Sequence, residues 1–192
     1  MRILGVDPGT LVVGFGCLEH APPTPAATDQ AARAPMAHRV GNLAGSLGRD
    51  RVQLVRAGVL RLGRAEPVQD RLGRLADEMR ALIASLAPDG VALEEAYFGK
   101  SVQSALRLGE ARGVILAEAS RAGIVVEQFA PARVKRAIAG AGAATKERVA
   151  AMVAQALRLG GALPADATDA LAVGLCCLEA RRVLNATALR RP

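Results

Sequence analysis

Short hydrophobic runs of strand length are interleaved with longer stretches whose hydrophobic residues recur every three or four positions. The strand-like runs cover residues 2–6, 11–18, 52–62, 91–96 and 124–129. Pro8 and Gly9 separate the first two runs and favour a turn, so these runs predict a β-hairpin. Asp7 then stands at the end of the first strand of the hairpin.

The longer stretches predict helices, and their ends carry matching signals. The expected helices cover 69–87, 101–122, 131–139, 145–159 and 166 to about 183. Proline suits a first helical turn, as at Pro131, and Thr145 suits an N-cap. Strands interleaved with helices predict an α/β fold class, with a mixed central sheet, an N-terminal β-hairpin and helices on both faces.

The chain length of 192 residues favours one domain, which we place at residues 1–185. Residues 20–50 are rich in proline and alanine and lack periodicity, which predicts a flexible insertion. Residues 186–192 are expected to form a disordered tail. Both histidines, His20 and His38, fall in the insertion, where nothing in the sequence fixes their geometry for a metal.

Composition narrows the class of protein. Hydrophobic residues make up 51% of the chain but aromatic residues only 2%, so the core must consist of Ala, Val, Leu and Ile. No apolar run reaches the roughly 18 residues that cross a membrane, and the N-terminus lacks a signal-peptide pattern. Cys17, Cys176 and Cys177 form no CxxC pair, which disfavours a disulfide framework or a cysteine zinc site. A reducing cytoplasm fits best.

Positive charge is concentrated in the second half of the chain. Residues 1–98 carry 11 basic and 11 acidic residues, whereas residues 99–192 carry 14 basic and 7 acidic residues and hold the whole net charge of +7. This asymmetry suggests a face that binds a polyanion, with nucleic acid as the leading candidate. A genome composition that favours Arg and Ala would produce the same excess without a binding role.

Carboxylates occur where a simple hydrophobic core would not place them. Asp7 ends one strand, and Glu94 and Glu95 lie in another. Asp166 and Asp169 stand three residues apart in the first turn of a helix and therefore share one face. An acid within a strand rich in Val and Leu is costly unless it is paired or bound to a metal. The helix pair also has a purely structural explanation, because acids complement the dipole at a helix N-terminus.

Four of these carboxylates could converge from two strands and one helix start, with no histidine or cysteine beside them. Hard oxygen ligands select Mg²⁺ or Mn²⁺ rather than zinc. Two such ions about 3.5–4 Å apart can hold the attacking and the leaving oxygen of a phosphoryl displacement. The basic second half of the chain would then hold the phosphate backbone of a nucleic acid.

Four blocks of sequence carry a resemblance to a known family. In order they read MRILGVDPGT-LVVGFGCLE, VALEEAYFGKSVQSALRLGEARGVILA, PARVKRAIAGAGAATKERVAAMV and PADATDALAVGL. DPGT alone is a weak motif, but the last three blocks in this order are highly specific. The chain resembles the RuvC family of bacterial Holliday-junction resolvases, also called crossover junction endodeoxyribonucleases. The resemblance implies an RNase H-like fold of the RNase H/retroviral-integrase superfamily.

The resemblance also implies which carboxylates act. The catalytic and metal-binding acids of the family fall on Asp7, Glu94, Asp166 and Asp169. It selects Glu94 over Glu95, a choice that spacing alone leaves open.

Further site residues concern DNA. Tyr97 corresponds to an aromatic residue of the family that stacks on an unpaired base, although a half-buried packing residue is the alternative. Lys135 and Lys146 correspond to basic residues that contact DNA near the scissile phosphate, the alternative being a solvated helix face. Charge and placement alone add five candidate backbone contacts: Arg107, Arg112, Arg133, Arg136 and Arg148.

The function that the resemblance implies is resolution of four-way DNA junctions by paired symmetric nicks during recombination and repair. The cofactor would be Mg²⁺, one or two ions per subunit with Mn²⁺ as a substitute, and the products would carry 5′-phosphate ends. A symmetric junction calls for two sites related by a two-fold axis, so we expect a homodimer. The family also implies the RuvA–RuvB branch-migration complex as a partner.

Two other classes of protein remain as alternatives. Actin-like ATPases and sugar kinases also begin with a strand followed by Asp and Gly-Thr, but they use two such folds per chain. A non-catalytic nucleic-acid-binding module of RNase H-like fold is the second alternative, and acids at all four matched positions argue against it.

Overall fold

The structure is a computed structural model that describes residues 1–21, 51–95 and 101–188. Within these residues five strands form one mixed sheet in the order β3-β2-β1-β4-β5. The strands are β1 (Arg2–Asp7), β2 (Val12–Ala21), β3 (Arg51–Arg61), β4 (Gly90–Glu94) and β5 (Val126–Phe129). β2 runs antiparallel to β1 and β3, whereas β4 runs parallel to β1 and β5. The predicted hairpin and mixed sheet are thus confirmed.

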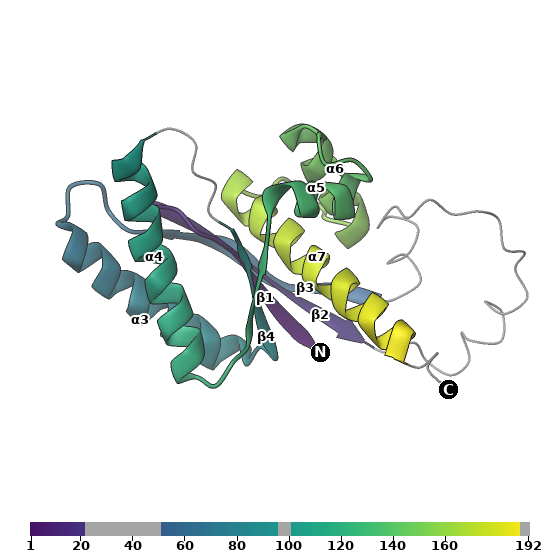
Figure 1. Cartoon of the computed structure of the whole chain (residues 1–192), viewed down its shortest axis with the longest axis horizontal. Helices are drawn as coiled ribbons and strands as arrows, with labels where there is room; N and C mark the ends of the chain where they lie inside the picture. The colour runs from purple at the N-terminus through teal and green to yellow at the C-terminus, as the bar shows by residue number, and fades with distance from the viewer. Residues whose placement is uncertain (22–50, 96–100, 189–192) are drawn as a thin grey trace, which may run out of the picture.

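Helices cover both faces of this sheet, as the sequence predicts (Figure 1). One face packs against α3 (Val68–Leu86) and α4 (Val102–Arg121). The other face packs against the second group of helices, which comprises α5 (Pro131–Ala139), α6 (Lys146–Leu157) and α7 (Ala165–Ala188).

Alternation along the strands sorts the core into two layers. In β1, Ile3 packs toward the side of α7, whereas Leu4 and Val6 pack toward α3 and α4. In β4, Ala92 packs on the same side of the sheet as Ile3, toward α7, and Leu93 packs on the opposite side, toward α3 and α4. Each face of the sheet is therefore buried, which explains why these strands read as continuous hydrophobic runs.

Helix starts follow the expected capping chemistry. The Ser101 hydroxyl accepts a hydrogen bond from the amide of Ser104 at the start of α4. The Thr145 hydroxyl accepts one from the amide of Arg148 at the start of α6. Pro131 occupies the first turn of α5, as predicted. These caps satisfy amides that have no partner within the helix.

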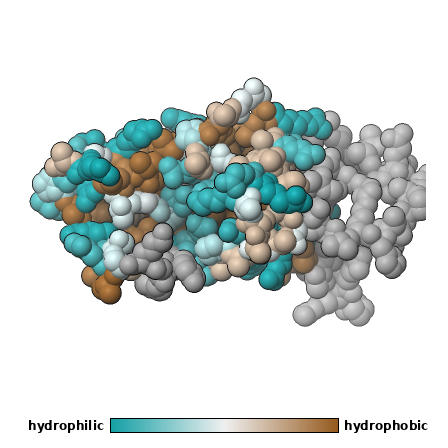
Figure 2. Space-filling view, turned by 90° about the horizontal axis from the view of Figure 1, so that it is seen from above, coloured by the Kyte–Doolittle hydropathy of each residue, from teal (hydrophilic) through white to brown (hydrophobic). Residues whose placement is uncertain are grey.

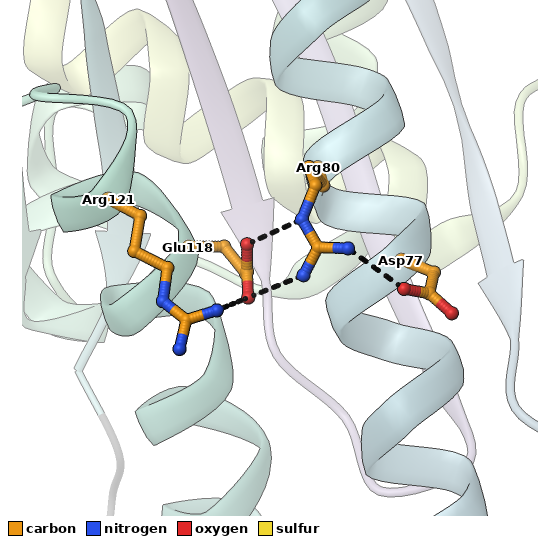
Figure 3. A network of polar contacts seen from close by, with 4 residues as sticks. All are labelled: Asp77, Arg80, Glu118 and Arg121. Carbon is orange, nitrogen blue, oxygen red and sulfur yellow. Dashed lines mark hydrogen bonds and ion pairs between the residues drawn. The ribbon is translucent and has the colours of Figure 1, made fainter.

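An ion-pair network joins α3 to α4 on the side of the sheet away from α7 (Figure 3). Glu118 of α4 is only 6% exposed, and its carboxylate accepts hydrogen bonds from the Nε and Nη2 atoms of Arg80 at 3.2 and 3.1 Å. Arg121 lies 3.4 Å from the same carboxylate, and Asp77 lies 3.0 Å from Arg80. A buried carboxylate needs such partners, so this network is expected to fix the packing of the two helices.

Several element boundaries differ from the sequence prediction by one or more residues. His20 lies inside β2, because the hairpin strands pair further along than the apolar run suggests, up to Ala21 opposite Arg51. β4 ends at Glu94. α7 continues to Ala188, so residues 186–188 of the expected tail are helical. Most of the predicted insertion, including His38, lies outside the described residues, and the single domain at 1–185 stays a prediction.

Two further expectations concern the cysteines and the membrane. Cys17, Cys176 and Cys177 are buried free thiols. Burial raises the pKa of Cys176 to about 11 and that of Cys177 to about 12. None of the helices in the described ranges is long and apolar enough to cross a membrane.

Candidate active site

Three elements bring the predicted acids to one end of the sheet. Asp7 is the last residue of β1, and Glu94 is the last residue of the neighbouring parallel strand β4, whose Leu93 pairs with Val6. Asp166 and Asp169 lie in the first turns of α7, which crosses β1 and β2. The negative charges of Glu94, Asp169 and Asp166 all act on Asp7, in that order of strength. The structure thus brings the four predicted acids together.

The faces of the strands explain why Glu94 joins this group. Ala92 packs toward α7, and Glu94 follows it by two residues, so its side chain lies on the same face. The Glu94 and Asp7 carboxyl groups are close enough for each to shift the pKa of the other. Glu95 comes one residue later and is exposed. The alternation of small and large residues in β4 is the signal that could have made this choice from the sequence.

The electrostatics of the site are dominated by burial and by the repulsion between like charges. Burial raises the pKa of Asp7 to about 8, and the nearby charges of Glu94, Asp169 and Asp166 add to this effect. Burial, followed by the charge of Asp169, likewise raises the pKa of Glu94. The cluster therefore holds more negative charge than its surroundings compensate.

Two lysines border the acids. The Nζ atom of Lys146, in the first turn of α6, lies 3.1 Å from Oδ2 of Asp169. That hydrogen bond raises the pKa of Lys146, whose side chain is 77% exposed. The charge of Lys135, on α5, acts on Glu94. Both lysines thus lie beside the acids, where the sequence predicts them.

Three of the acids, Asp7, Glu94 and Asp169, share one open cleft with Lys135 and Lys146, and its volume is about 220 Å³. Asp166 does not line this cleft. Hydrophobic residues of α5, α6 and α7 complete its walls, namely Pro131, Val134, Val149 and Ala172. Figure 2 looks down on this end of the molecule, where hydrophilic side chains border hydrophobic ones over α5 and α6.

Arg112 of α4 has contacts that the sequence did not suggest. Its Nη1 donates to the backbone carbonyl of Glu94, and its Nη2 donates to Oε1 of Gln128 in β5. Burial lowers the pKa of Arg112. These contacts tie the end of β4 to α4 and β5, so Arg112 holds the backbone of a site residue. The sequence offered it only as a DNA contact.

The other arginines predicted to contact DNA lie on α4, α5 and α6, and none of the four lines the cleft of the acids. Arg107 pairs with Glu110 on α4 at 3.0 Å. The guanidinium carbon of Arg133 lies 4.9 Å from the ring centroid of Phe129. Arg136 and Arg148 are exposed on α5 and α6. Tyr97 lies outside the described residues. A DNA-binding role for each of these residues stays a prediction.

The donor set of the cleft fits a hard divalent cation. All four acids offer carboxylate oxygens, which Mg²⁺ and Mn²⁺ prefer. Burial first, and then repulsion between neighbouring acids, raises the pKa of Asp7 and of Glu94, so a bound cation would favour their ionised forms. In the described part of the chain, no three His, Cys, Asp or Glu side chains lie close enough to hold one ion as they stand.

A mixed sheet with acids at the ends of β1 and β4 and at the start of α7 defines an RNase H-like nuclease. Comparison with known proteins narrows this class. The sequence model of the family "Crossover junction endodeoxyribonuclease RuvC" matches residues 39–177. The chain belongs to the RuvC family, whose members are divalent-metal-dependent endonucleases.

Individual relatives agree with this assignment. The crossover junction endodeoxyribonuclease RuvC of Halorhodospira halophila is 39% identical over 175 residues, which are 91% of this chain and 88% of that protein. The Thermus thermophilus RuvC structure superimposes with a TM-score of 0.75 at 29% identity, covering 95% of this chain and 96% of that one. T. thermophilus RuvC in complex with a Holliday junction substrate superimposes with a TM-score of 0.74 at 27% identity, over the same shares of the two chains.

Proposed function

We propose that the chain resolves Holliday junctions, cutting four-way DNA by paired symmetric nicks in recombination and repair. The observation that carries this function is the cleft in which three of the acids gather with two lysines, in a chain that resembles T. thermophilus RuvC over 95% of its length. The cleft is lined by Asp7, Glu94, Asp169, Lys135 and Lys146, and the charge of Asp166 acts on Asp7 from the first turn of α7. That relative has been solved with a Holliday junction substrate. The actin-like and kinase-like alternative has no comparable support.

Asp7, Glu94, Asp166 and Asp169 would hold the divalent cation, which we take to be Mg²⁺ with Mn²⁺ as a substitute. When bound, such a cation supplies an activated water and stabilises charge on the phosphate. Hydrolysis would leave a 5′-phosphate and a 3′-hydroxyl. The acids stand on two strands and a helix rather than on loops, and such elements fix the positions of the side chains relative to a bound phosphate.

The lysines act on the DNA. Lys146 is mostly exposed while it pairs with Asp169, so its ammonium group can reach a phosphate oxygen without leaving the cleft. Lys135 lines the same cleft from α5. Both would hold the scissile strand against the carboxylates, and Tyr97 would stack on a base unpaired at the crossover.

A homodimer would place two such sites on a symmetric junction. An exposed stripe on α4 supports this arrangement, because Val102, Leu106, Gly109 and Gly113 recur at intervals of four, three and four. Val102 is 79% and Leu106 is 63% exposed. Apolar residues at this spacing are typical of helices that pack against another helix. Leu106→Arg would then convert a dimer to a monomer in sedimentation equilibrium, whereas Arg74→Met on α3 would not.

RuvA–RuvB as a partner and the cytoplasm as the location belong to the same proposal. Both rest on membership of the family and await direct tests, such as co-purification with a junction-bound RuvA–RuvB complex.

The decisive experiment uses a synthetic four-way junction with each strand labelled in turn. With Mg²⁺, the protein is expected to nick two strands of like polarity at symmetric positions, as read on denaturing gels. A linear duplex of the same sequence is the matched control and should stay uncut. Tight junction binding without nicks, in Mg²⁺ and in Mn²⁺, would instead support the non-catalytic binding module.

A further inference from the structure

The N-terminal half of α7 packs backbone against backbone on the sheet, where glycines of β1 and β2 face it (Figure 1). A Cβ atom on Gly5 would lie within 3.0 Å of the carbonyl oxygen of Ala170 and of the amide nitrogen of Gly174. A Cβ atom on Gly14 would lie within 3.0 Å of the carbonyl oxygen of Asp166. Real Cβ atoms do not approach other atoms this closely, so a side chain at either glycine would push the strand and the helix apart.

Gly14 is the glycine of this contact that bears on the acids. It pairs with Asp7 across the antiparallel β1–β2 ladder, so Asp7 and the missing side chain of Gly14 face the same side. Its neighbour on α7 is the peptide group of Asp166 itself, with the amide nitrogen of Ala167 3.1 Å from the Cβ position. The atom that Gly14 lacks would therefore fill the space between the end of β1 and the first turn of α7.

We infer that Gly14 is a positioning residue for the carboxylate site, because its lack of a side chain lets the first turn of α7 approach β1 and brings Asp166 and Asp169 to Asp7. This inference rests on the proposed function for one of its readouts, the rate of junction cleavage. Gly14 has no side chain with which to bind a substrate or a cation. It acts by setting the distance between two elements that carry the acids.

Gly16 provides a matched control on the same strand and the same face. A Cβ atom there would lie 2.5 Å from Cδ2 and 2.7 Å from Cγ of Leu171, so an alanine disturbs a core side chain of the same helix. The amide nitrogen of Leu171 lies 3.3 Å from the same position, a backbone contact much looser than the 1.9 Å between the Gly14 Cβ position and the Asp166 carbonyl oxygen. The alanine at Gly16 therefore presses mainly on a side chain, five residues beyond Asp166. Gly73 on α3 has no atom within 4 Å of its Cβ position and serves as the neutral control.

The test compares Gly14→Ala, Gly16→Ala and Gly73→Ala in the full chain. We expect Gly14→Ala to weaken Mn²⁺ binding, measured by calorimetry without DNA, by about tenfold or more. At saturating junction and Mg²⁺ its single-turnover cleavage should fall by about a hundredfold. Its junction affinity in EDTA should stay within about threefold of the parent, because that affinity comes from the basic contacts.

The control decides between positioning and simple destabilisation. Gly16→Ala should lower the melting temperature as well, yet keep Mn²⁺ affinity and cleavage within about threefold, because the acids stay in place. In the Gly14→Ala background, Asp166→Glu adds one methylene to the reach of the carboxylate and should restore part of the Mn²⁺ affinity. Equal Mn²⁺ affinity in the Gly14 and Gly16 variants would overturn the inference.

Two provisions keep the outcome informative. If Gly14→Ala does not fold, Gly5→Ala meets α7 at Ala170, one turn further along, and makes the same test with the same expected loss of Mn²⁺ affinity. If the parent protein binds Mn²⁺ but leaves junctions uncut, the proposed function has failed. The calorimetric comparison of Gly14→Ala with Gly16→Ala still decides the positioning role in that case.

Discussion

The carboxylate site and the ion-pair network between α3 and α4 both remove negative charge from water, but they compensate it differently. In the network, one buried carboxylate, Glu118, meets the guanidinium groups of Arg80 and Arg121. In the site, Asp7 lies among three other acids, and the ion pair within reach is that of Lys146 with Asp169. The network is complete within the chain, whereas the site is short of positive charge.

This difference separates a structural cluster from a functional one. A buried carboxylate with bidentate partners costs little to keep and much to disrupt. Repulsion within a group of acids that has too few cations nearby destabilises the folded chain. A cation that binds to the acids removes this repulsion and therefore stabilises the folded chain. Changes to the site should therefore affect cleavage more than stability, and changes to the network should do the reverse.

The largest expected effect belongs to Asp7→Asn. This change keeps the size of the side chain but replaces a carboxyl group, which can ionise to hold a cation, with an amide that stays neutral. Single-turnover cleavage of a four-way junction should fall by about a thousandfold or more. Junction affinity in EDTA should stay within about threefold, since the phosphate contacts are basic residues elsewhere. Parallel loss of binding and cleavage would show that Asp7 maintains the fold instead.

Lys146→Met comes next. It removes the ammonium group next to Asp169 but keeps most of the apolar stem of the side chain. We expect cleavage at saturating junction to fall by about 10- to 100-fold, because one positive group beside the reacting phosphate is lost. Arg74→Met removes a comparable exposed ion pair, with Glu66 on the far side of the sheet, and should leave cleavage unchanged. A rate for Lys146→Met within twofold of the parent would remove Lys146 from the site.

Arg80→Met tests the other half of the comparison. The variant leaves Glu118 with Arg121 alone, at the longer distance of 3.4 Å. The free energy of unfolding should fall, because the buried carboxylate of Glu118 loses two of its hydrogen bonds, although the exposure of Arg80 to solvent reduces the loss. Cleavage should be unchanged at temperatures where the variant is folded.

A double change controls for the Arg80 result. Arg80→Met together with Glu118→Leu should recover much of the lost stability in urea unfolding, because no buried charge is left without a partner. Arg74→Met, which breaks an exposed pair, should cost about 0–1 kcal/mol. If Arg80→Met costs no more than Arg74→Met, the network is an ordinary surface feature.

The order of strands and helices was predictable because its signals are local. Proline and glycine after Asp7, and the caps at Ser101 and Thr145, depend on neighbouring residues, and the structure follows them. The extension of β2 through His20 was not predictable, because it depends on pairing with Arg51 and Val52, some thirty residues further along the chain.

The site shows the same limit. Two strand ends and a helix start could be proposed from hydrophobic runs, but their meeting depends on which strands are neighbours and how closely α7 approaches. The resemblance supplied the four acids. The contacts of Arg112 with the carbonyl of Glu94 and of Gly14 with Asp166 arise between segments far apart in sequence, and no local pattern marks them.

The smallest effect, and the one that most directly compares the two clusters, is the dependence of stability on pH without metal. The pKa of Asp7 rises from an ordinary 3.8 to about 8 in the folded chain. Between these values the folded protein keeps a proton that the unfolded chain has released, so stability is lost as pH rises from about 4 to about 8. The amide introduced by Asp7→Asn stays neutral and avoids this loss. In EDTA the variant should therefore melt higher than the parent, by a margin that is larger at pH 8 than at pH 5.

Circular dichroism suits the measurement of this margin because the chain has no tryptophan. Mg²⁺ should raise the melting temperature of the parent more than that of the Asp7→Asn variant, and so narrow the margin at pH 8. Arg80→Met should leave the pH dependence of the melting temperature unchanged, since the positive charges of the network are arginine side chains of the chain itself. A margin that is the same at both pH values would mean that the acids of the site are compensated within the chain, as Glu118 is.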